Sequence, residues 1–340
     1  MSRNKMLSWI LICCFAIFLV PLQSMAIENA DKYGLNFFNS KSDEKGMGWG
    51  WTQKTKTLSI KNLTLNVNGE NGITALYGIN LPKGSTLVVQ GENNININCN
   101  EDTFFAYGLC AAYKDLTIKG PGTLNITISN SVKGLGFEGL RTCGDLKLNN
   151  VKLNFYFKNC KTSKYSMFSN GDNFNIILGK GSKNEINSPD AWLLGAANCN
   201  VNIKGAGSLV IKQPTEFAYD WVISAKNFTI QDGGIVQINC TAKAVVDCRS
   251  ALIDNAIVIV EAGGKAFSAS PKIKNKAVVA TKTTDGMEYT LMKSGTISRD
   301  FTWDKGNTLI IPQDLKLTVV DKVTFKNNGV IKGDIVYASK

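Results

Sequence analysis

The sequence has no histidine among its 340 residues. Histidine is the commonest general base in enzymes, and it also activates serine and cysteine nucleophiles. Its absence excludes Ser–His and Cys–His catalysis and removes the commonest metal ligand.

Arginine is also scarce. Only Arg141, Arg249 and Arg299 follow residue 26, so the net charge of +11 comes mainly from lysines spread along the chain. A basic exported protein favours acidic partners such as polyanionic glycans or lipid headgroups, although lysine recognises an anion less specifically than arginine does. A solvated basic surface without a partner is the other interpretation of the same charge.

Cysteine is present but lacks a metal-binding spacing. The nine cysteines include no Cys-x-x-Cys pair, whereas a zinc site needs thiolates clustered at short spacing, so we expect no zinc. We expect the cysteines to be buried as small apolar side chains. Export also permits disulfides, and the pair that the sequence indicates for one is Cys240 with Cys248, because a short turn would bring them together.

A long hydrophobic run occurs only at the start of the chain. Arg3 and Lys5 precede an apolar stretch over 7–22, and residues 24–26 offer a small-residue cleavage site. This order is typical of a secretory signal peptide, and the run is shorter than a membrane span requires. We expect residues 1–26 to be removed and the protein to be secreted, extracellular or at the cell surface, with the periplasm as an alternative.

Helical periodicity is missing after residue 30, and an imperfect repeat of about 22 to 30 residues takes its place. The clearest copies begin at Tyr107, Phe137, Trp192 and Trp221. Each contains short strands with apolar residues two apart, joined by turns rich in Gly, Asn and Asp. This period of two is that of a β-strand with one buried side.

Such strand pairs fit antiparallel hairpins or the coils of a solenoid. The repeat favours coils, because like positions recur once per unit and would stack at about 4.8 Å. We therefore predict an all-β fold, a right-handed parallel β-helix. The strand cores align Leu116 with Leu146 and Phe174, and Val236 with Ile257. The expected aromatic ladder contains Tyr107, Phe137, Phe168, Trp192, Trp221 and Phe267.

Several segments resemble the coils of bacterial carbohydrate-binding-domain-containing β-solenoid proteins. They are the Trp-x-Trp opening at 48–60, the coil at 79–93, the repeat core at 115–124, and the terminal segments 315–319 and 326–333. The resemblance covers most of residues 47–333 and implies a solenoid that binds a glycan at the cell surface or outside the cell. It carries over no sugar-contact residue and no calcium motif.

The expected organisation follows from the repeat. It is a signal peptide at 1–26, an N-terminal cap and first strand at 27–60, the solenoid at 61–280, a hairpin insertion at 281–312, and a C-terminal coil or cap at 313–340. Solenoid ends need caps because an open coil exposes a strand edge. Trp49 and Trp51 are expected to plug the first coil, and sugar stacking is the alternative role for them.

Three acids recur at similar positions just before strands: Asp115, Asp145 and Asp172. Stacked carboxylates could hold a hard cation such as calcium, and paired acids could hydrolyse a glycoside. Aspartate in such positions also supplies ordinary turn hydrogen bonds. No cofactor is required by these motifs, and calcium is the one cation they suggest.

We expect a non-catalytic protein that binds an extracellular polysaccharide or surface glycan, acidic polymers included, and no nucleic acid. The candidate ligand-binding residues are Trp192, Trp221 and Arg141. A structural or adhesin module is the alternative, and a polysaccharide lyase or glycoside hydrolase is the third interpretation. A line of exposed aromatic residues would favour the first, a uniformly polar Asn/Lys face the second, and clustered acids near Arg141 the third.

Overall fold

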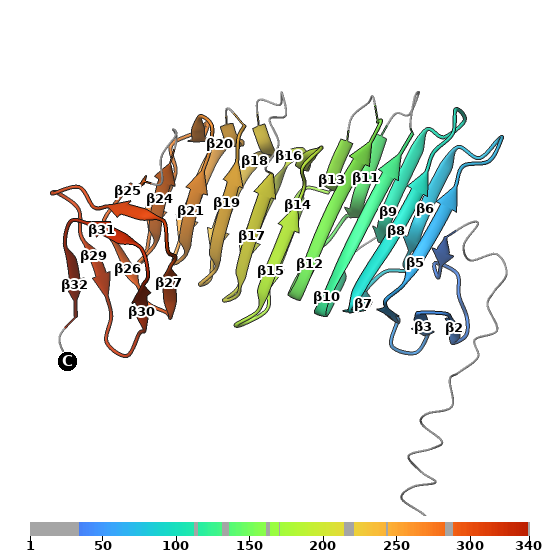
Figure 1. Ribbon diagram of the computed structural model, residues 1–340, viewed down its shortest axis with the longest axis horizontal. Helices are drawn as coiled ribbons and strands as arrows, with labels where there is room; N and C mark the ends of the chain where they lie inside the picture. The colour runs from blue at the N-terminus through green and yellow to red at the C-terminus, as the bar shows by residue number, and fades with distance from the viewer. Residues whose placement is uncertain are drawn as a thin grey trace, which may run out of the picture.

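The computed structural model describes residues 34–111, 115–130, 136–160, 164–169, 171–213, 221–242, 244–282 and 288–338. The expected signal peptide lies outside these ranges. Within them every regular element is a β-strand, and no helix is long and apolar enough to span a membrane. The strands stack in parallel into a β-solenoid of about nine turns, an elongated body with its coils side by side (Figure 1). The predicted all-β parallel solenoid is confirmed.

Each coil crosses three faces in turn. The first face contains β4 (Thr57–Lys61), β7 (Ser85–Gln90), the starts of β10 (Leu116–Ser129) and β12 (Leu146–Lys158), β14 (Asn173–Leu178), the ends of β16 (Trp192–Lys204), β18 (Trp221–Gln231) and β20 (Ala244–Asp254), and β23 (Lys272–Lys274).

The second face continues the same coils. It contains β5 (Thr64–Asn68), β8 (Glu92–Asn98), the ends of β10 and β12, β15 (Lys183–Asn187), β17 (Ser208–Gln213), β19 (Ile235–Cys240), β21 (Ile257–Glu261) and β24 (Val278–Lys282).

The third face closes each coil. It contains β1 (Leu35–Asn36), β6 (Ala75–Asn80), β9 (Phe105–Ala111), β11 (Gly136–Thr142), β13 (Lys164–Phe168), the starts of β16, β18 and β20, and β22 (Lys265–Phe267).

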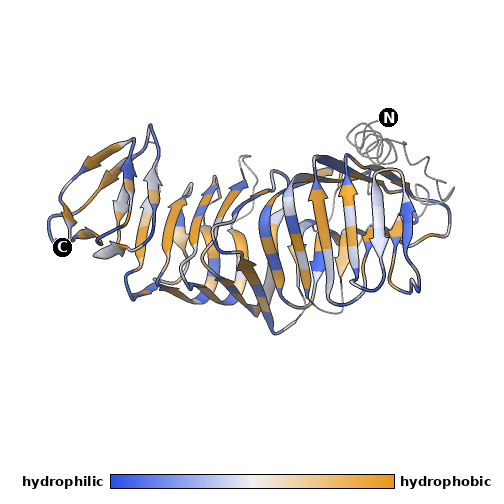
Figure 2. Cartoon of the chain, turned by 90° about the horizontal axis from the view of Figure 1, so that it is seen from below, coloured by the Kyte–Doolittle hydropathy of each residue, from blue (hydrophilic) through white to orange (hydrophobic). Residues whose placement is uncertain are grey.

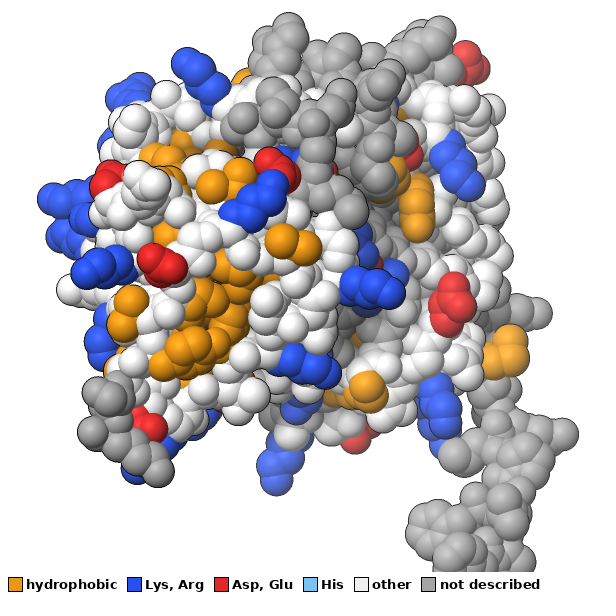
Figure 3. Space-filling view, turned by 60° about the vertical axis from the view of Figure 1, so that its left-hand side comes forward, with side chains coloured by type: hydrophobic (Ala, Val, Ile, Leu, Met, Phe, Trp, Pro, Cys, Tyr) orange, Lys and Arg blue, Asp and Glu red, His pale blue; other side chains and the backbone are white. Residues whose placement is uncertain are grey.

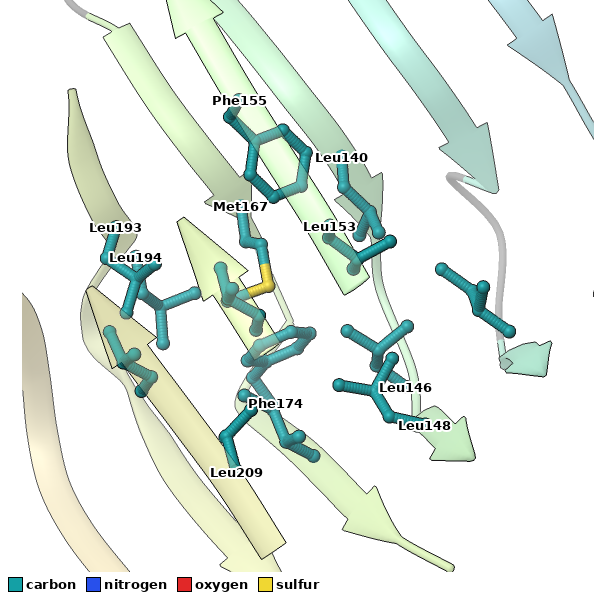
Figure 4. Packing of buried hydrophobic residues seen from close by; sticks show 14 of the residues in the cluster. Leu140, Leu146, Leu148, Leu153, Phe155, Met167, Phe174, Leu193, Leu194 and Leu209 are labelled. Carbon is teal, nitrogen blue, oxygen red and sulfur yellow. The ribbon is translucent and has the colours of Figure 1, made fainter. Parts of the chain in front are cut away.

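Alternating side chains fill the space between the three faces. Inward positions are Leu, Ile, Val and Phe, whereas outward positions are mostly polar, so bands of opposite hydropathy alternate along the strands (Figure 2). Leu140 from the third face, Leu146 from the first and Leu153 from the second converge on one core (Figure 4). Burial of this continuous apolar interior is the main term that stabilises the stack.

The register agrees with the sequence alignment at the start of the repeats and departs from it later. Leu116 pairs with Leu146 as expected. Leu146 then pairs with Ile176 rather than Phe174, a shift of two residues that leaves both side chains inside. Val236 pairs with Val258 rather than Ile257, and this one-residue shift turns Ile257 to the opposite side of the strand.

Successive coils approach closely within the third face. Gly108 lies in the middle of β9, and a Cβ added to it would come within 2.2 Å of Cγ2 of Ile126 and 2.6 Å of the carbonyl oxygen of Gly139. At the ends of β10 and β12 asparagine adopts the left-handed conformation, at Asn130 (φ 61°) and Asn159 (φ 55°), which this residue tolerates better than most.

The N-terminal end is covered by antiparallel strands. β2 (Glu44–Gly46) pairs with β3 (Trp49–Thr52), and β3 pairs with β4 on the edge of the first coil. Trp51 is 2% exposed and stacks on Phe37 with ring centroids 4.8 Å apart. Trp49 packs edge-on against the same phenylalanine. These rings occupy the position of a plug beneath the coil.

The C-terminal segment is a second, smaller stack of three parallel ladders. It contains β25 (Glu288–Leu291), β26 (Gly295–Ile297), β27 (Phe301–Trp303), β28 (Thr308–Ile310), β29 (Leu317–Val319), β30 (Phe325–Asn327), β31 (Val330–Lys332) and β32 (Ile335–Tyr337). Only the antiparallel pair of β24 with β25 resembles the hairpin expected at 281–312. The strands that follow it form coils instead of a side insertion, and we call β25–β32 the C-terminal unit.

The C-terminal unit packs on the outer side of the second face. Ile257, Ile259, Val278 and Ala280 point outward there and are buried in one cluster with residues of the unit. At the seam, Tyr289 donates a hydrogen bond to Glu261 (3.1 Å). Figure 3, turned toward this end, shows apolar side chains gathered among scattered lysines and arginines.

Candidate binding surfaces

One column of side chains runs along the outside of the third face. The strand register and ring contacts place these residues in it: Tyr77, Tyr107, Glu138, Tyr165, Trp192 and Trp221. We call this set the outer column. Each member projects from the same position of successive coils, so neighbours lie one strand spacing, about 4.8 Å, apart.

The rings of the outer column stack on one another. Tyr77 and Tyr107 have centroids 5.1 Å apart, as do Tyr165 and Trp192. Trp192 and Trp221 follow at 5.2 Å with their planes 15° apart. Rings inside the stack therefore turn their faces toward each other, and Tyr107 is buried, whereas Trp221 at the end of the stack has no second ring partner among the described residues.

Glu138 is the one member of the outer column without a ring, and Arg141, three residues later on the same strand, joins the rings on either side of it. Its guanidinium carbon lies 5.1 Å from the centroid of Tyr107 and 5.3 Å from that of Phe168. Its Nη1 donates a hydrogen bond to the hydroxyl of Tyr107 (2.8 Å). A planar cation between two rings is favourable, so Arg141 continues the stack past Glu138.

Glu138 is a buried carboxyl group at the centre of the outer column. It is 6% exposed, and its Oε2 lies 3.5 Å from Nε of Arg141 but accepts no hydrogen bond. Burial raises the pKa of Glu138 to about 7, and the charge of Arg141 opposes this shift. A group so enclosed is not positioned to touch a substrate, which favours a structural role over catalysis.

The predicted ligand-binding residues come together, but the predicted ladder is partly wrong. Trp192 and Trp221 are consecutive rings of the outer column, and Arg141 joins the same stack. Phe137 and Phe267, expected in the ladder, point into the core instead. Phe168 lies beside the column, in register with Arg141.

Sequence reasoning missed Tyr77, Glu138 and Tyr165. Each lies opposite Tyr107 or one register step beyond it. The signal that could have found them is a one-residue offset in the alignment of the repeats. Aligning Glu138 instead of Phe137 with Tyr107 restores the column.

A shallow trough of about 510 Å³ opens on the outside of the second face. β10 lies in its middle and contributes threonine and asparagine side chains, and the flanking strands add the longer glutamate of β8 and the lysines and tyrosine of β12. The lining residues are Glu92, Asn94, Thr123, Asn125, Thr127, Lys152, Asn154, Tyr156 and Lys158. Carboxylate, amide, hydroxyl and ammonium groups are all present there, and each of them can hydrogen-bond to a hydroxyl-rich ligand.

Asparagine ladders cross the same face. Asn125 donates to Asn94 (2.9 Å), Asn154 donates to Asn125 (2.6 Å), and Asn187 donates to Asn154 (2.5 Å). Such amide-to-amide bonds between coils are typical of stacked strands. They tie the coils together and consume much of the hydrogen-bonding capacity of these amides.

The three acids considered for calcium are not gathered into one group among the residues that the structure describes. Asp115 accepts a hydrogen bond from the backbone N–H of Asp145 (3.0 Å), and Asp145 accepts one from the amide of Asn175 (2.7 Å). Among the described residues no three acidic or cysteine side chains gather as metal ligands, and Asp172 joins no such group. The carboxylates of Asp115 and Asp145 serve as acceptors between coils, which is the turn role that the sequence left open.

The predicted disulfide is not formed. Cys240 and Cys248 are free, buried thiols, because Cys240 ends β19 on the second face whereas Cys248 lies at the far side of the third face in β20. Burial raises the pKa of the Cys240 thiol to about 11. Both therefore behave as small, unreactive core side chains.

No protein-family model matches the chain, and neither a curated protein nor a solved structure does. The resemblance noted in the sequence is thus supported for its β-solenoid architecture alone.

Proposed function

We propose that the protein is a non-catalytic, exported solenoid that binds an extracellular polysaccharide on its outer surface. The observation that carries this proposal is the outer column, a line of aromatic side chains on one face. Sugar rings pack their C–H bonds against the electron-rich face of an aromatic ring. An extended surface built from repeating coils suits an extended polymer.

Trp221 is the ring of the column best placed for stacking. It lies at the end of the stack, and the next residue in register is Ala244, which has no ring. The face of Trp221 turned away from Trp192 thus meets no other ring of the described residues. The exposed Lys265 follows in the same register and supplies a donor for sugar hydroxyl or carboxylate groups.

A Trp221→Ala variant tests this proposal. Removing a stacking ring from a binding site weakens binding by roughly tenfold, equivalent to ~1.4 kcal/mol. The measurement is retardation of the protein in gels that contain neutral or acidic polysaccharides. Tyr337→Ala is the matched control, because Tyr337 is 65% exposed and lies in the C-terminal unit. Equal retardation of the wild type and both variants would rule out the outer column as the site.

A structural or adhesin module is the second candidate. The asparagine ladders favour it, because amides that bond to one another give a rigid spacer without needing a ligand. This function predicts a folded, stable protein that no polysaccharide retards.

A further inference from the structure

We infer that the trough on the second face is a separate subsite for a short oligosaccharide that contains uronic acid, with Tyr156 as its stacking ring and Lys158 as the partner of the carboxylate. This inference rests on the proposed function, because both sites bind saccharide, but it concerns a different face of the solenoid.

The shape of the trough follows from the residue sizes along three consecutive strands. β10 contributes Thr123, Asn125 and Thr127 to the floor, whereas β12 contributes the longer Lys152 and Tyr156 to one wall. The trough runs along β10 for about 13 Å, since Thr127 lies four residues after Thr123, and it is about 10 Å wide across two strand spacings. These dimensions suit a short, flat chain of sugar rings.

Tyr156 differs from the rings of the outer column. It is partly exposed, and among the described residues neither another ring nor a hydrogen-bond partner contacts it. Thr127, its register partner on the floor, is likewise partly exposed. The phenol ring therefore keeps a face for a sugar ring, and its hydroxyl group keeps both donor and acceptor capacity.

The charged side chains that line the trough differ in whether they already have a partner. Lys152 forms an ion pair with Glu185 (2.9 Å), and Glu92 accepts a hydrogen bond from Asn125 (3.1 Å). Lys158 is exposed and makes no ion pair with the residues that the structure describes. It lies two residues after Tyr156 on the same side of β12, so its ammonium group can reach a carboxylate on a sugar stacked over that ring.

Calorimetric titration of the full mature protein with uronate trimers, of galacturonate and of mannuronate, tests the inference. The neutral trimers of galactose and mannose serve as the comparison. We expect one uronate trimer to bind at least tenfold more tightly than its neutral counterpart, with an affinity that falls as salt is raised. Trimers that bind equally well with and without carboxylates would overturn the role of Lys158.

Three variants separate the roles of the two residues. Tyr156→Ala should weaken both kinds of trimer at least tenfold, whereas Tyr156→Phe, which keeps the ring, should stay within about threefold of the wild type. Lys158→Ala should remove the preference for the uronate trimer and leave the neutral trimer unchanged. Lys326→Ala, an exposed lysine of the C-terminal unit, is the matched control and should change nothing.

The outcomes distinguish this inference from the proposed function. If trimers bind but Tyr156→Ala and Lys158→Ala bind them as the wild type does, the trough is not the subsite and polysaccharide binding still stands. If polysaccharides and trimers alike fail to bind the wild type, both are wrong. Loss of trimer binding in Tyr156→Ala, with polymer binding still sensitive to Trp221→Ala, would establish two sites.

Discussion

Glu138 replaces a ring in the outer column, and this one residue makes the column sensitive to pH. The carboxyl group is packed between Tyr107 and Tyr165 by register, and its only charged neighbour among the described residues is Arg141. Burial raises its pKa from an ordinary 4.5 to about 7. The folded protein therefore holds this proton to a higher pH than the unfolded chain does.

We predict that the free energy of unfolding falls as pH rises from about 4.5 to about 7. Over this range the folded state binds more protons than the unfolded state, and a shift of this size corresponds to roughly 3 kcal/mol. The Glu138→Gln variant cannot ionise, so it should lack this decline. Urea unfolding of both proteins at about pH 5 and about pH 8 measures the difference.

Glu185→Gln is the control for that experiment. Burial acts to raise the pKa of Glu185, but hydrogen bonds from Lys152 and Asn187 hold it below the ordinary value. Glu185 therefore stabilises the folded protein above its unfolded pKa, and this contribution is lost as pH falls. An identical pH dependence for wild type and Glu138→Gln would show that Glu138 does not titrate as described.

At the scale of single elements, glycines inside the strands of the third face determine how closely successive coils can approach. We predict that Gly108→Ala destabilises the protein by roughly 1–3 kcal/mol or more, because the new methyl group would overlap Ile126 and the backbone of Gly139. Gly50→Ala is the control, since no atom lies within 4 Å of its added Cβ. Thermal unfolding that ranks the two variants equally would contradict the packing described around Gly108.

The strand registers show which parts of the structure were accessible from sequence. Leu116 and Leu146 were aligned correctly because the residues around them keep one spacing. Leu146 was aligned with Phe174, but its partner is Ile176, two residues later. Because side chains on one side of a strand recur every second residue, both alignments bury apolar side chains and the sequence pattern could not distinguish them. Ile257 was assigned to the core, yet it faces outward under the C-terminal unit. Periodicity alone cannot identify a strand that is covered on both sides.

The candidate sites were less accessible than the fold. Trp192, Trp221 and Arg141 were identified from residue type, and the structure places them in one stack. The trough around Tyr156 was not identified, because it arises from three strands about 30 residues apart whose side chains differ in length. A hollow formed where long and short side chains meet on neighbouring strands cannot be recognised in the sequence of any one strand.

At the scale of the whole molecule, the solenoid and the C-terminal unit share one hydrophobic seam. We predict that Ile259→Lys, which places a charge in this seam, destabilises the docking of the unit by roughly 3 kcal/mol. Limited proteolysis should then cleave the C-terminal unit before the solenoid. Val210→Lys is the control, since Val210 points outward on the same face outside the seam. Simultaneous loss of both parts in Ile259→Lys would show that they unfold as one body.

The central claim is that this solenoid binds saccharide on its outer surface, and the most direct measurement is binding of the purified mature protein to an array of neutral and acidic polysaccharides. The array is probed with calcium and again with a chelator. We predict salt-sensitive binding to at least one uronic-acid polymer that the chelator does not abolish, because the carboxylates of Asp115 and Asp145 already accept hydrogen bonds from neighbouring coils. No binding to any polysaccharide would contradict the claim and leave a structural or adhesin module.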